Sequence, residues 1–209
     1  MTDPNFTHLA LLVDRSGSMA PIASDMNGAI STMLAEHAKA PGKILVDVTT
    51  FDDEIEFPYR DVHPNDIAGD VLVPRGLTAL NDALGRTIVS LGERLSALNE
   101  NDRPGHVIFV IVTDGAENAS KEFTTDQVSA MVTEQREKYN WEFLFLAANI
   151  DAFSTGATYG FDAGQTIQYG FASAGAHAMM AAATASTLRS RSGADGSFTQ
   201  DERDGSLSV

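Results

Sequence analysis

Short apolar runs alternate along the chain with longer stretches in which apolar residues recur every three or four positions. The short runs cover residues 9–13, 44–51, 107–112 and 143–147, which is the length of β-strands. The clearest helical pattern covers residues 79–98, where one continuous apolar stripe is formed by Leu80, Leu84, Ile88, Leu91, Leu95 and Leu98. This alternation predicts an α/β fold with a doubly wound, mostly parallel, Rossmann-like sheet flanked by helices.

We expect about six strands, one of them antiparallel. The run at residues 55–59 follows the run at 44–51 after a short polar turn, which predicts a hairpin and hence an antiparallel strand at the sheet edge. Residues 107–112 are apolar at every position, as in a central strand that is covered on both faces. Residues 166–169 are a weaker candidate for a further edge strand.

The apolar pattern assigns residues 1–188 to one domain that closes with an Ala-rich helix over residues 172–188. Residues 189–209 are rich in Gly, Ser and Asp, and Phe198, Leu207 and Val209 are their only large apolar residues. We therefore predict a flexible polar tail, because little apolar surface offsets the entropy of ordering it. The alternative is that Phe198 docks the segment onto the domain.

The composition of the chain disfavours several classes of binding partner. The formal net charge of −15 opposes binding to nucleic-acid phosphates and to anionic membranes, so we expect neither. The chain has no cysteine, which excludes disulfides and thiolate chemistry. Residues 1–7 are polar and lack the pattern of a signal peptide, and we expect a cytoplasmic protein. The oligomeric state is left open by the sequence.

The candidate functional side chains lie where two predicted apolar strands end. Asp14 and Asp114 directly follow the runs at residues 9–13 and 107–112, and the carboxyl ends of parallel strands meet at one rim of the sheet. Ser16 and Ser18 follow Asp14 at intervals of two residues, and Gly17 allows a tight turn between them. We therefore expect two carboxylates and two hydroxyls to converge at this rim.

Thr78 is the fifth candidate. It precedes the helix at residues 79–98, so it should lie at the same rim, although Thr is also a common helix N-cap. The five side chains offer only hard oxygen ligands. Such a set favours Mg²⁺, with Mn²⁺ or Ca²⁺ as alternatives.

These residues carry a resemblance to the von Willebrand factor type A (vWA) domain family. Asp14-Arg15-Ser16-Gly17-Ser18 is similar to the family's Asp-x-Ser-x-Ser signature, and Gly76-Leu77-Thr78 and Thr113-Asp114-Gly115 resemble its threonine loop and second aspartate. The resemblance covers roughly residues 7–170. It implies a metal-ion-dependent adhesion site with direct coordination by Ser16, Ser18 and Thr78. Asp14 and Asp114 would act mainly through water or hydrogen bonds.

The resemblance implies a non-catalytic, metal-dependent protein-binding module or adaptor that captures an Asp or Glu carboxylate of a partner. The short single-domain form looks like the intracellular bacterial and phage members. One alternative is a scaffold that binds through its last helix and tail without a functional metal. A second is Mg²⁺-dependent phosphoryl transfer, which is disfavoured because Ser16 stands where aspartyl phosphatases need a second Asp.

Two groups of polar residues receive ordinary structural interpretations. Residues 52–54 and Glu56 are interpreted as a solvated hairpin near the rim, although they could also give the rim a selective edge. The five histidines are scattered, so they are interpreted as surface residues or as satisfied core residues.

Overall fold

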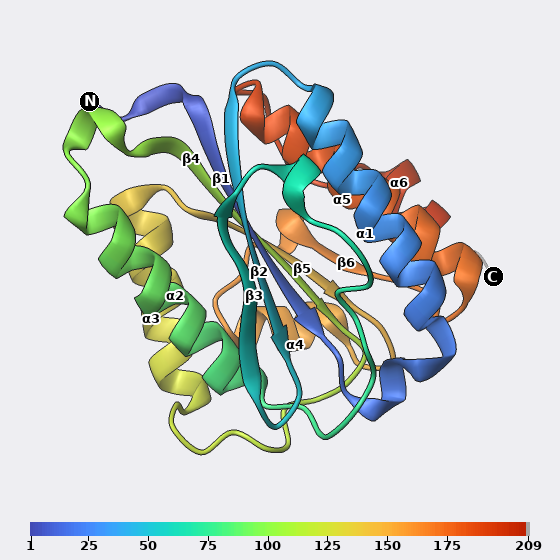
Figure 1. The fold of residues 1–209 in the computed structure, drawn as a ribbon. Helices are drawn as coiled ribbons and strands as arrows, with labels where there is room; N and C mark the ends of the chain where they lie inside the picture. The colour runs from blue at the N-terminus through green and yellow to red at the C-terminus, as the bar shows by residue number, and fades with distance from the viewer. Residues whose placement is uncertain (208–209) are drawn as a thin grey trace.

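Six strands form a single sheet in a computed structural model, which describes residues 1–207 (Figure 1). Their order across the sheet is β3-β2-β1-β4-β5-β6, and β3 alone among these described strands runs antiparallel to its neighbour. The predicted fold class and the antiparallel edge strand are therefore confirmed. The strands are β1 (Asp3–Asp14), β2 (Lys43–Phe51), β3 (Ile55–Val62), β4 (Pro104–Thr113), β5 (Glu142–Ala147) and β6 (Thr166–Gln168).

Helices cover both faces of the sheet (Figure 1). One face packs against α2 (Leu80–Ala97), α3 (Thr125–Tyr139) and the short α4 (Ala152–Thr158). The other packs against α1 (Ala23–Lys39) and α5 (Ser173–Arg191), with α6 (Gln200–Leu207) lying beside α5. Short 3₁₀ helices are η1 (Gly17–Ile22), η2 (Pro64–Asp66), η3 (Glu100–Asp102) and η4 (Ala163–Gln165). No helix within residues 1–207 is long and apolar enough to cross a membrane.

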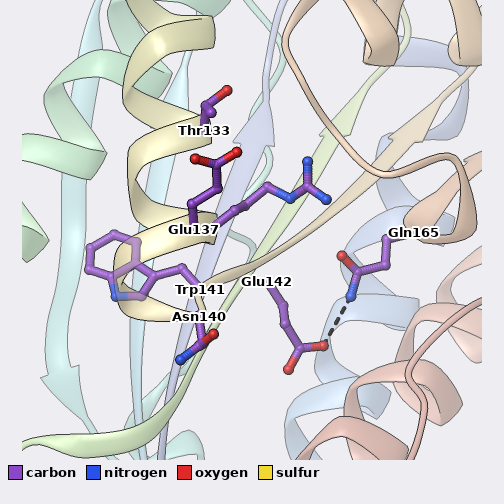
Figure 2. A pocket seen from close by; sticks show the side chains of 7 residues that line it. Thr133, Glu137, Asn140, Trp141, Glu142 and Gln165 are labelled. Carbon is purple, nitrogen blue, oxygen red and sulfur yellow. Dashed lines mark hydrogen bonds between the residues drawn. The ribbon is translucent and has the colours of Figure 1, made fainter.

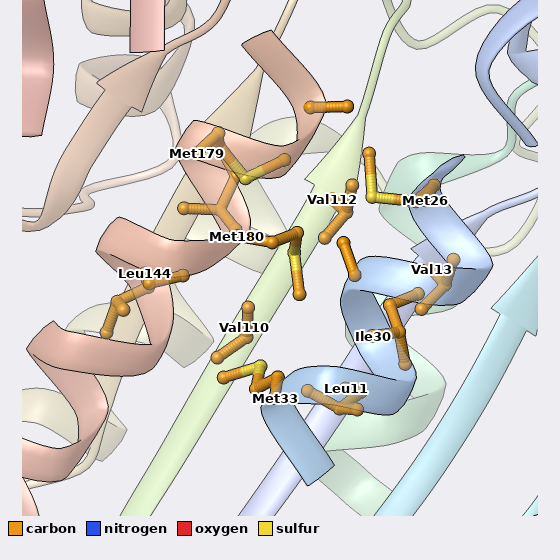
Figure 3. Close-up of a cluster of buried hydrophobic side chains, with 14 of the residues drawn as sticks. Leu11, Val13, Met26, Ile30, Met33, Val110, Val112, Leu144, Met179 and Met180 are labelled. Atoms are coloured by element: carbon orange, nitrogen blue, oxygen red, sulfur yellow. The ribbon is translucent and has the colours of Figure 1, made fainter. Parts of the chain in front are cut away.

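Alternate residues of β1 face the two layers, as the period of a strand requires. Leu11 and Val13 point toward α1 and α5, where Met179 and Met180 fill the space between helix and sheet (Figure 3). Leu12 points to the other side and joins the core formed with α2. The strand is therefore buried on both faces, and its last residue is held at a fixed position.

The strand order reverses between β1 and β4. From β1 the chain continues outward through β2 to β3, whereas β4 leads outward in the opposite direction through β5 to β6. The loops that leave the carboxyl ends of β1 and β4 must therefore diverge, which opens a crevice between them. Asp14 ends β1 and Asp114 directly follows β4, so both carboxylates lie at this crevice.

The segment expected to form a flexible tail contains helical residues in the structure. The helix expected over residues 172–188 is α5, which runs to Arg191, and the chain then returns along the domain to form α6. Phe198 is only 6% exposed and belongs to the core between α1, α5 and the sheet. The burial of Phe198 agrees with the alternative in which it docks the segment, the flexibility of the segment stays a prediction, and residues 208 and 209 lie outside the described part.

Polar contacts explain why a segment with so little apolar surface packs. Arg189 forms a salt bridge to Glu202 at 2.8 Å, and the Ser206 hydroxyl donates to the carbonyl of Gln168 at 2.7 Å. The Gly170 amide donates to the carbonyl of Ser206 at 2.8 Å. These bonds pair backbone groups beside the edge strand β6. Apolar periodicity in the sequence does not reveal such polar contacts.

Candidate functional site

Asp14 is the innermost residue of the predicted site. Its side chain is fully buried at the end of β1, and each carboxylate oxygen accepts one short hydrogen bond. Oδ1 accepts from the Ser16 amide at 2.7 Å, and Oδ2 accepts from the Thr113 hydroxyl at 2.6 Å. Burial outweighs these bonds and raises the pKa of Asp14 to about 6, with a further small contribution from the charge of Asp114. Asp14 is thus a fixed and poorly solvated negative charge.

A chain of hydroxyl contacts joins the two strand ends. The Ser16 and Ser18 hydroxyl oxygens lie 3.0 Å apart, and the Ser18 hydroxyl donates to Oδ1 of Asp114 at 2.8 Å. The second oxygen of Asp114, Oδ2, is buried and has no hydrogen-bond partner. Burial also raises the pKa of Asp114. A buried carboxylate oxygen without a partner is costly, and it indicates a place where a cation would be stabilised.

Thr78 does not serve as the helix N-cap that its position allowed. The N-cap of α2 is Ala79, and no side chain caps the helix. Thr78 is instead held by its backbone, because its amide donates to Oδ1 of Asn118 at 3.0 Å and its carbonyl accepts from the Asn118 amide at 2.9 Å. A Cβ on Gly115 would lie 3.6 Å from Oγ1 of Thr78, so this hydroxyl is close to the backbone next to Asp114.

The geometry of these oxygens suits a small divalent cation. Neighbouring oxygens in an octahedral Mg²⁺ shell lie about 3 Å apart, since each sits about 2.1 Å from the ion at right angles. The Ser16–Ser18 and Ser18–Asp114 separations of 3.0 and 2.8 Å match that spacing. The donor set contains no nitrogen or sulfur. The hydroxyls of Ser16 and Ser18 and the carboxylate of Asp114 therefore fit such an ion.

An ion-pair network beside the site was not predicted. Asp52 is only 1% exposed, and it bonds to Arg75 at 2.6 Å and to Arg15 at 3.3 Å. Arg15 also bonds to Glu56 at 2.7 Å. The interpretation of Asp52 as part of a solvated hairpin is therefore wrong, because the hairpin turns back onto the loop after β1, where the two arginines neutralise its acids.

Three further residues make contacts that support the proposed ligands. Asn118, which the sequence placed near the ion, holds the backbone of Thr78, so the two residues whose role was missed are Thr113 and Tyr169, whose hydroxyl donates to the carbonyl of Thr113 at 3.3 Å. Strand pairing was the available signal for Thr113: Val13 lies opposite Val112, which places Asp14 next to Thr113. Burial, with the charges of Asp114 and Asp14, raises the pKa of Tyr169, so its hydroxyl stays protonated.

A pocket of about 440 Å³ lies away from this rim, around the start of β5 (Figure 2). Its lining is polar, and Gln165 donates to Glu142 at 3.0 Å across it. Glu142 also accepts from the hydroxyl of Ser190 at 2.6 Å. None of the five predicted ligands lines this pocket, so it has no part in the candidate site.

Neither a protein-family profile nor a curated protein matches the sequence. Solved structures do match. Proximal thread matrix protein 1 of the mussel byssus superposes with a TM-score of 0.62 at 13% identity, over 88% of this chain and 46% of that one. Manganese-loaded TRAP protein of Plasmodium vivax gives 0.58 at 14% identity, over 75% and 63%.

A third match decides the fold class. The ArnB paralog VWA2 of Sulfolobus acidocaldarius superposes with a TM-score of 0.50 at 12% identity, over 84% of this chain and 44% of that one. This chain has the vWA fold. Its length is about half that of the mussel protein, and it therefore corresponds to one part of these larger chains. In this vWA fold the candidate site lies where β1 and β4 diverge, at the carboxyl rim of the sheet.

Proposed function

We propose that the chain is a non-catalytic protein-binding module or adaptor that depends on a divalent metal. Asp14, Ser16, Ser18, Thr78 and Asp114 hold the ion, which is Mg²⁺ or Mn²⁺, with Ca²⁺ as the weaker alternative. A carboxylate of a protein partner completes the coordination. The observation that carries this proposal is the buried, unpartnered Oδ2 of Asp114 beside the hydroxyls of the Ser16-Gly17-Ser18 turn.

The ligand set supports capture of an external anion. Both oxygens of Asp14 accept protein hydrogen bonds, and in the proposed site Asp14 acts mainly through water or hydrogen bonds and neutralises little of the ion's charge directly. When bound, the metal supplies a Lewis-acidic centre that attracts one further anionic oxygen. The hydroxyls of Ser16, Ser18 and Thr78 add no charge, which favours a carboxylate as the sixth ligand.

The negative net charge of the chain supplies selectivity, because the acids of the rim are paired with arginine. Glu54 and Glu56 lie at the rim and pair with Arg75, and the chain carries a net charge of −15. An acidic partner is therefore repelled by the surface as a whole and attracted only where the cation sits. This makes binding of an acidic segment strictly conditional on the metal.

The side chains at the site do not supply a catalytic apparatus. Within residues 1–207, no histidine hydrogen-bonds to any of the five ligands, and both oxygens of Asp14 are engaged by the Ser16 amide and the Thr113 hydroxyl. We accordingly assign binding and not phosphoryl transfer. We also place the protein with the short intracellular bacterial or phage type of vWA protein, in the cytoplasm, with no nucleic-acid or membrane partner.

A displayed library of random peptides, selected on the protein in Mg²⁺ or Mn²⁺, tests the function. We expect enrichment of peptides that contain Asp or Glu, and loss of their binding in EDTA and in Asp14→Ala. The matched control is Asp25→Ala in the first turn of α1, which should bind like the wild type. Selected peptides that lack a carboxylate, or binding that survives EDTA, would refute the proposal.

A further inference from the structure

A second cluster of polar side chains lies on the β1–β2–β3 side of the sheet. It comprises His8 on β1, Asp47 on β2, Asp61 on β3 and Arg94 on α2. His8 and Asp47 are 1% and 3% exposed. His8 precedes Asp14 by six residues, which is about 20 Å along a strand, so the cluster is separate from the rim site.

The histidine is buried without a satisfying partner. Nε2 of His8 lies 3.1 Å from Oδ1 of Asp47, but the geometry is not that of a hydrogen bond, and Nε2 has no partner within the described structure. Nδ1 of the same ring lies 3.8 Å from Oδ1 of Asp61. The imidazole edge therefore faces one oxygen of each carboxylate at close range.

Arg94 determines which carboxylate oxygens face the histidine. Its guanidinium bonds to Oδ2 of Asp47 and to Oδ2 of Asp61. The two Oδ1 atoms are left on the side of His8. Oδ1 of Asp47 accepts from the Asp61 amide at 2.8 Å and, at a longer 3.5 Å, from Nη1 of Arg94, and it faces Nε2 of His8.

The backbone of β3 is distorted in a way that brings Asp61 to this place. Asp61 has a φ of 52°, which non-glycine residues seldom adopt. The register with β2 shifts around it, since Val46 pairs with Val62 whereas Val48 pairs with Tyr59. A bulge of this kind re-aims a side chain, and here it directs the Asp61 carboxylate toward His8 and Asp47.

We propose that His8, Asp47 and Asp61 form a second metal site, built for a zinc-class transition ion. One ring nitrogen of His8 and one oxygen of each aspartate are the ligands, which lie within 4.8 Å of one another, and Arg94 orients both carboxylates from the far side. Ligands about 2 Å from a tetrahedral Zn²⁺ lie about 3.3 Å apart, close to the 3.1 Å between His8 and Asp47.

The donor set separates this site from the rim site. A neutral imidazole with two carboxylates suits Zn²⁺, whereas the all-oxygen rim suits Mg²⁺ or Mn²⁺. Two aspartates and one arginine leave one net negative charge, which a divalent ion attracts. The Asp61 side chain is 48% exposed, so water reaches the fourth coordination position.

The test measures zinc binding in a chain that also carries Asp114→Ala, so that the rim site makes no contribution. We expect isothermal titration calorimetry with ZnCl₂ to give one equivalent of bound zinc. Adding His8→Gln or Asp61→Asn should lower the affinity at least tenfold. Asp61 is half exposed, so Asp61→Asn keeps the test valid if His8→Gln fails to fold.

His177→Gln, an exposed histidine of α5, is the control and should leave zinc binding unchanged. A long-range ¹H–¹⁵N spectrum should show a ring nitrogen of His8 shift on zinc addition. The proposal is overturned if the Asp114→Ala chain takes up no zinc, or if both ligand variants bind zinc as well as their parent. In that case the cluster is a structural polar network without a metal.

Discussion

The Thr113 hydroxyl donates a 2.6 Å hydrogen bond to Oδ2 of Asp14. This bond fastens the last residue of β4 to the last residue of β1 at the point where the strand order reverses. Asp14 also accepts from the Ser16 amide, so the carboxylate has one orientation, and that orientation sets the turn that carries Ser16 and Ser18. Thr113 is thus a positioning residue for the proposed metal ligands.

Thr113→Val removes this hydrogen bond while keeping the shape of the side chain. We expect the Mg²⁺ or Mn²⁺ affinity to fall about 10-fold to 100-fold, as for other groups that orient metal ligands. The free energy of unfolding should fall by about 1–3 kcal/mol, because a buried carboxylate loses a donor. Thr113→Ser keeps the hydroxyl and should stay close to the wild type. Equal metal affinity in the Val and Ser variants would contradict the positioning role.

Asp14→Asn should stabilise the protein in EDTA. Burial raises the pKa of Asp14 from 3.8 to about 6, so above pH 6 the folded state holds a charge that the unfolded state holds at lower cost. The expected gain at pH 8 is about 1–3 kcal/mol, and it should shrink as the pH falls through 6 toward 4, where Asp14 is protonated in the fold.

The asparagine keeps the local hydrogen bonds. Its amide would donate to Oγ1 of Thr113, whose hydroxyl can turn to the carbonyl of Gly115 at 3.2 Å. Urea unfolding at several pH values measures the effect, with Asp25→Asn in the first turn of α1 as the control. A variant less stable than the wild type at pH 8 in EDTA would show that the carboxylate is not destabilising.

His37 should make the fold sensitive to acid. Its Nε2 lies 2.8 Å from the Thr187 hydroxyl, and Arg191 contacts Nδ1 at 3.0 Å. Burial, with a smaller contribution from Arg191, lowers the pKa of His37 to about 3. The unfolded state therefore takes up a proton between pH 6.5 and 3 that the folded state does not, so stability is full above 6.5 and falls below it.

At pH 5 this loss amounts to about 2 kcal/mol. His37→Gln cannot take up the proton, so its unfolding free energy should decline less between pH 7 and pH 5 than that of the wild type. His177→Gln, on the exposed side of α5, should decline like the wild type. Parallel pH profiles for wild type and His37→Gln would show that His37 is not the acid-sensitive group.

A substitution of Phe198 tests whether the segment after α5 packs onto the domain. The side chain is 6% exposed in the core, so Phe198→Ala should lower the free energy of unfolding by about 3 kcal/mol or more. Chemical denaturation measures this cost, and Phe153→Ala, at a side chain 43% exposed on α4, is the control with a smaller expected loss. A cost near zero for Phe198→Ala would mean that the segment does not contribute to the folded state.

The sequence predicted the strands and helices that a regular spacing of apolar residues indicates. The six strands, the antiparallel β3 and the amphipathic α2 all follow from the spacing of large apolar residues, and the ends of β1 and β4 placed Asp14 and Asp114. It did not predict α6, because a helix with only Leu207 as a large apolar residue packs through polar contacts such as Arg189 to Glu202.

The apolar pattern of the sequence also did not predict the residues that support the site. Thr113, Tyr169 and Asp52 act through contacts between segments that are far apart in the sequence, and such contacts depend on strand register and on loop paths. The position of Asp61 depends on a register shift between β2 and β3, and no residue of the hairpin predicts that shift. Residue type and spacing therefore suggested the five proposed ligands, and the fold showed the contacts that Thr113 and Asp52 make beside them.

The most direct test of the central claim is a thermal melt of chelator-treated protein titrated with Mg²⁺ and Mn²⁺, beside Asp114→Ala and the control Asp25→Ala. An ion that binds only the folded state at 100 times its dissociation constant adds about 2.7 kcal/mol, which is a shift of several degrees. We predict that shift for the wild type and Asp25→Ala and none for Asp114→Ala. Melting temperatures that do not respond to either ion, or that respond equally in Asp114→Ala, would contradict a metal site at the β1–β4 rim.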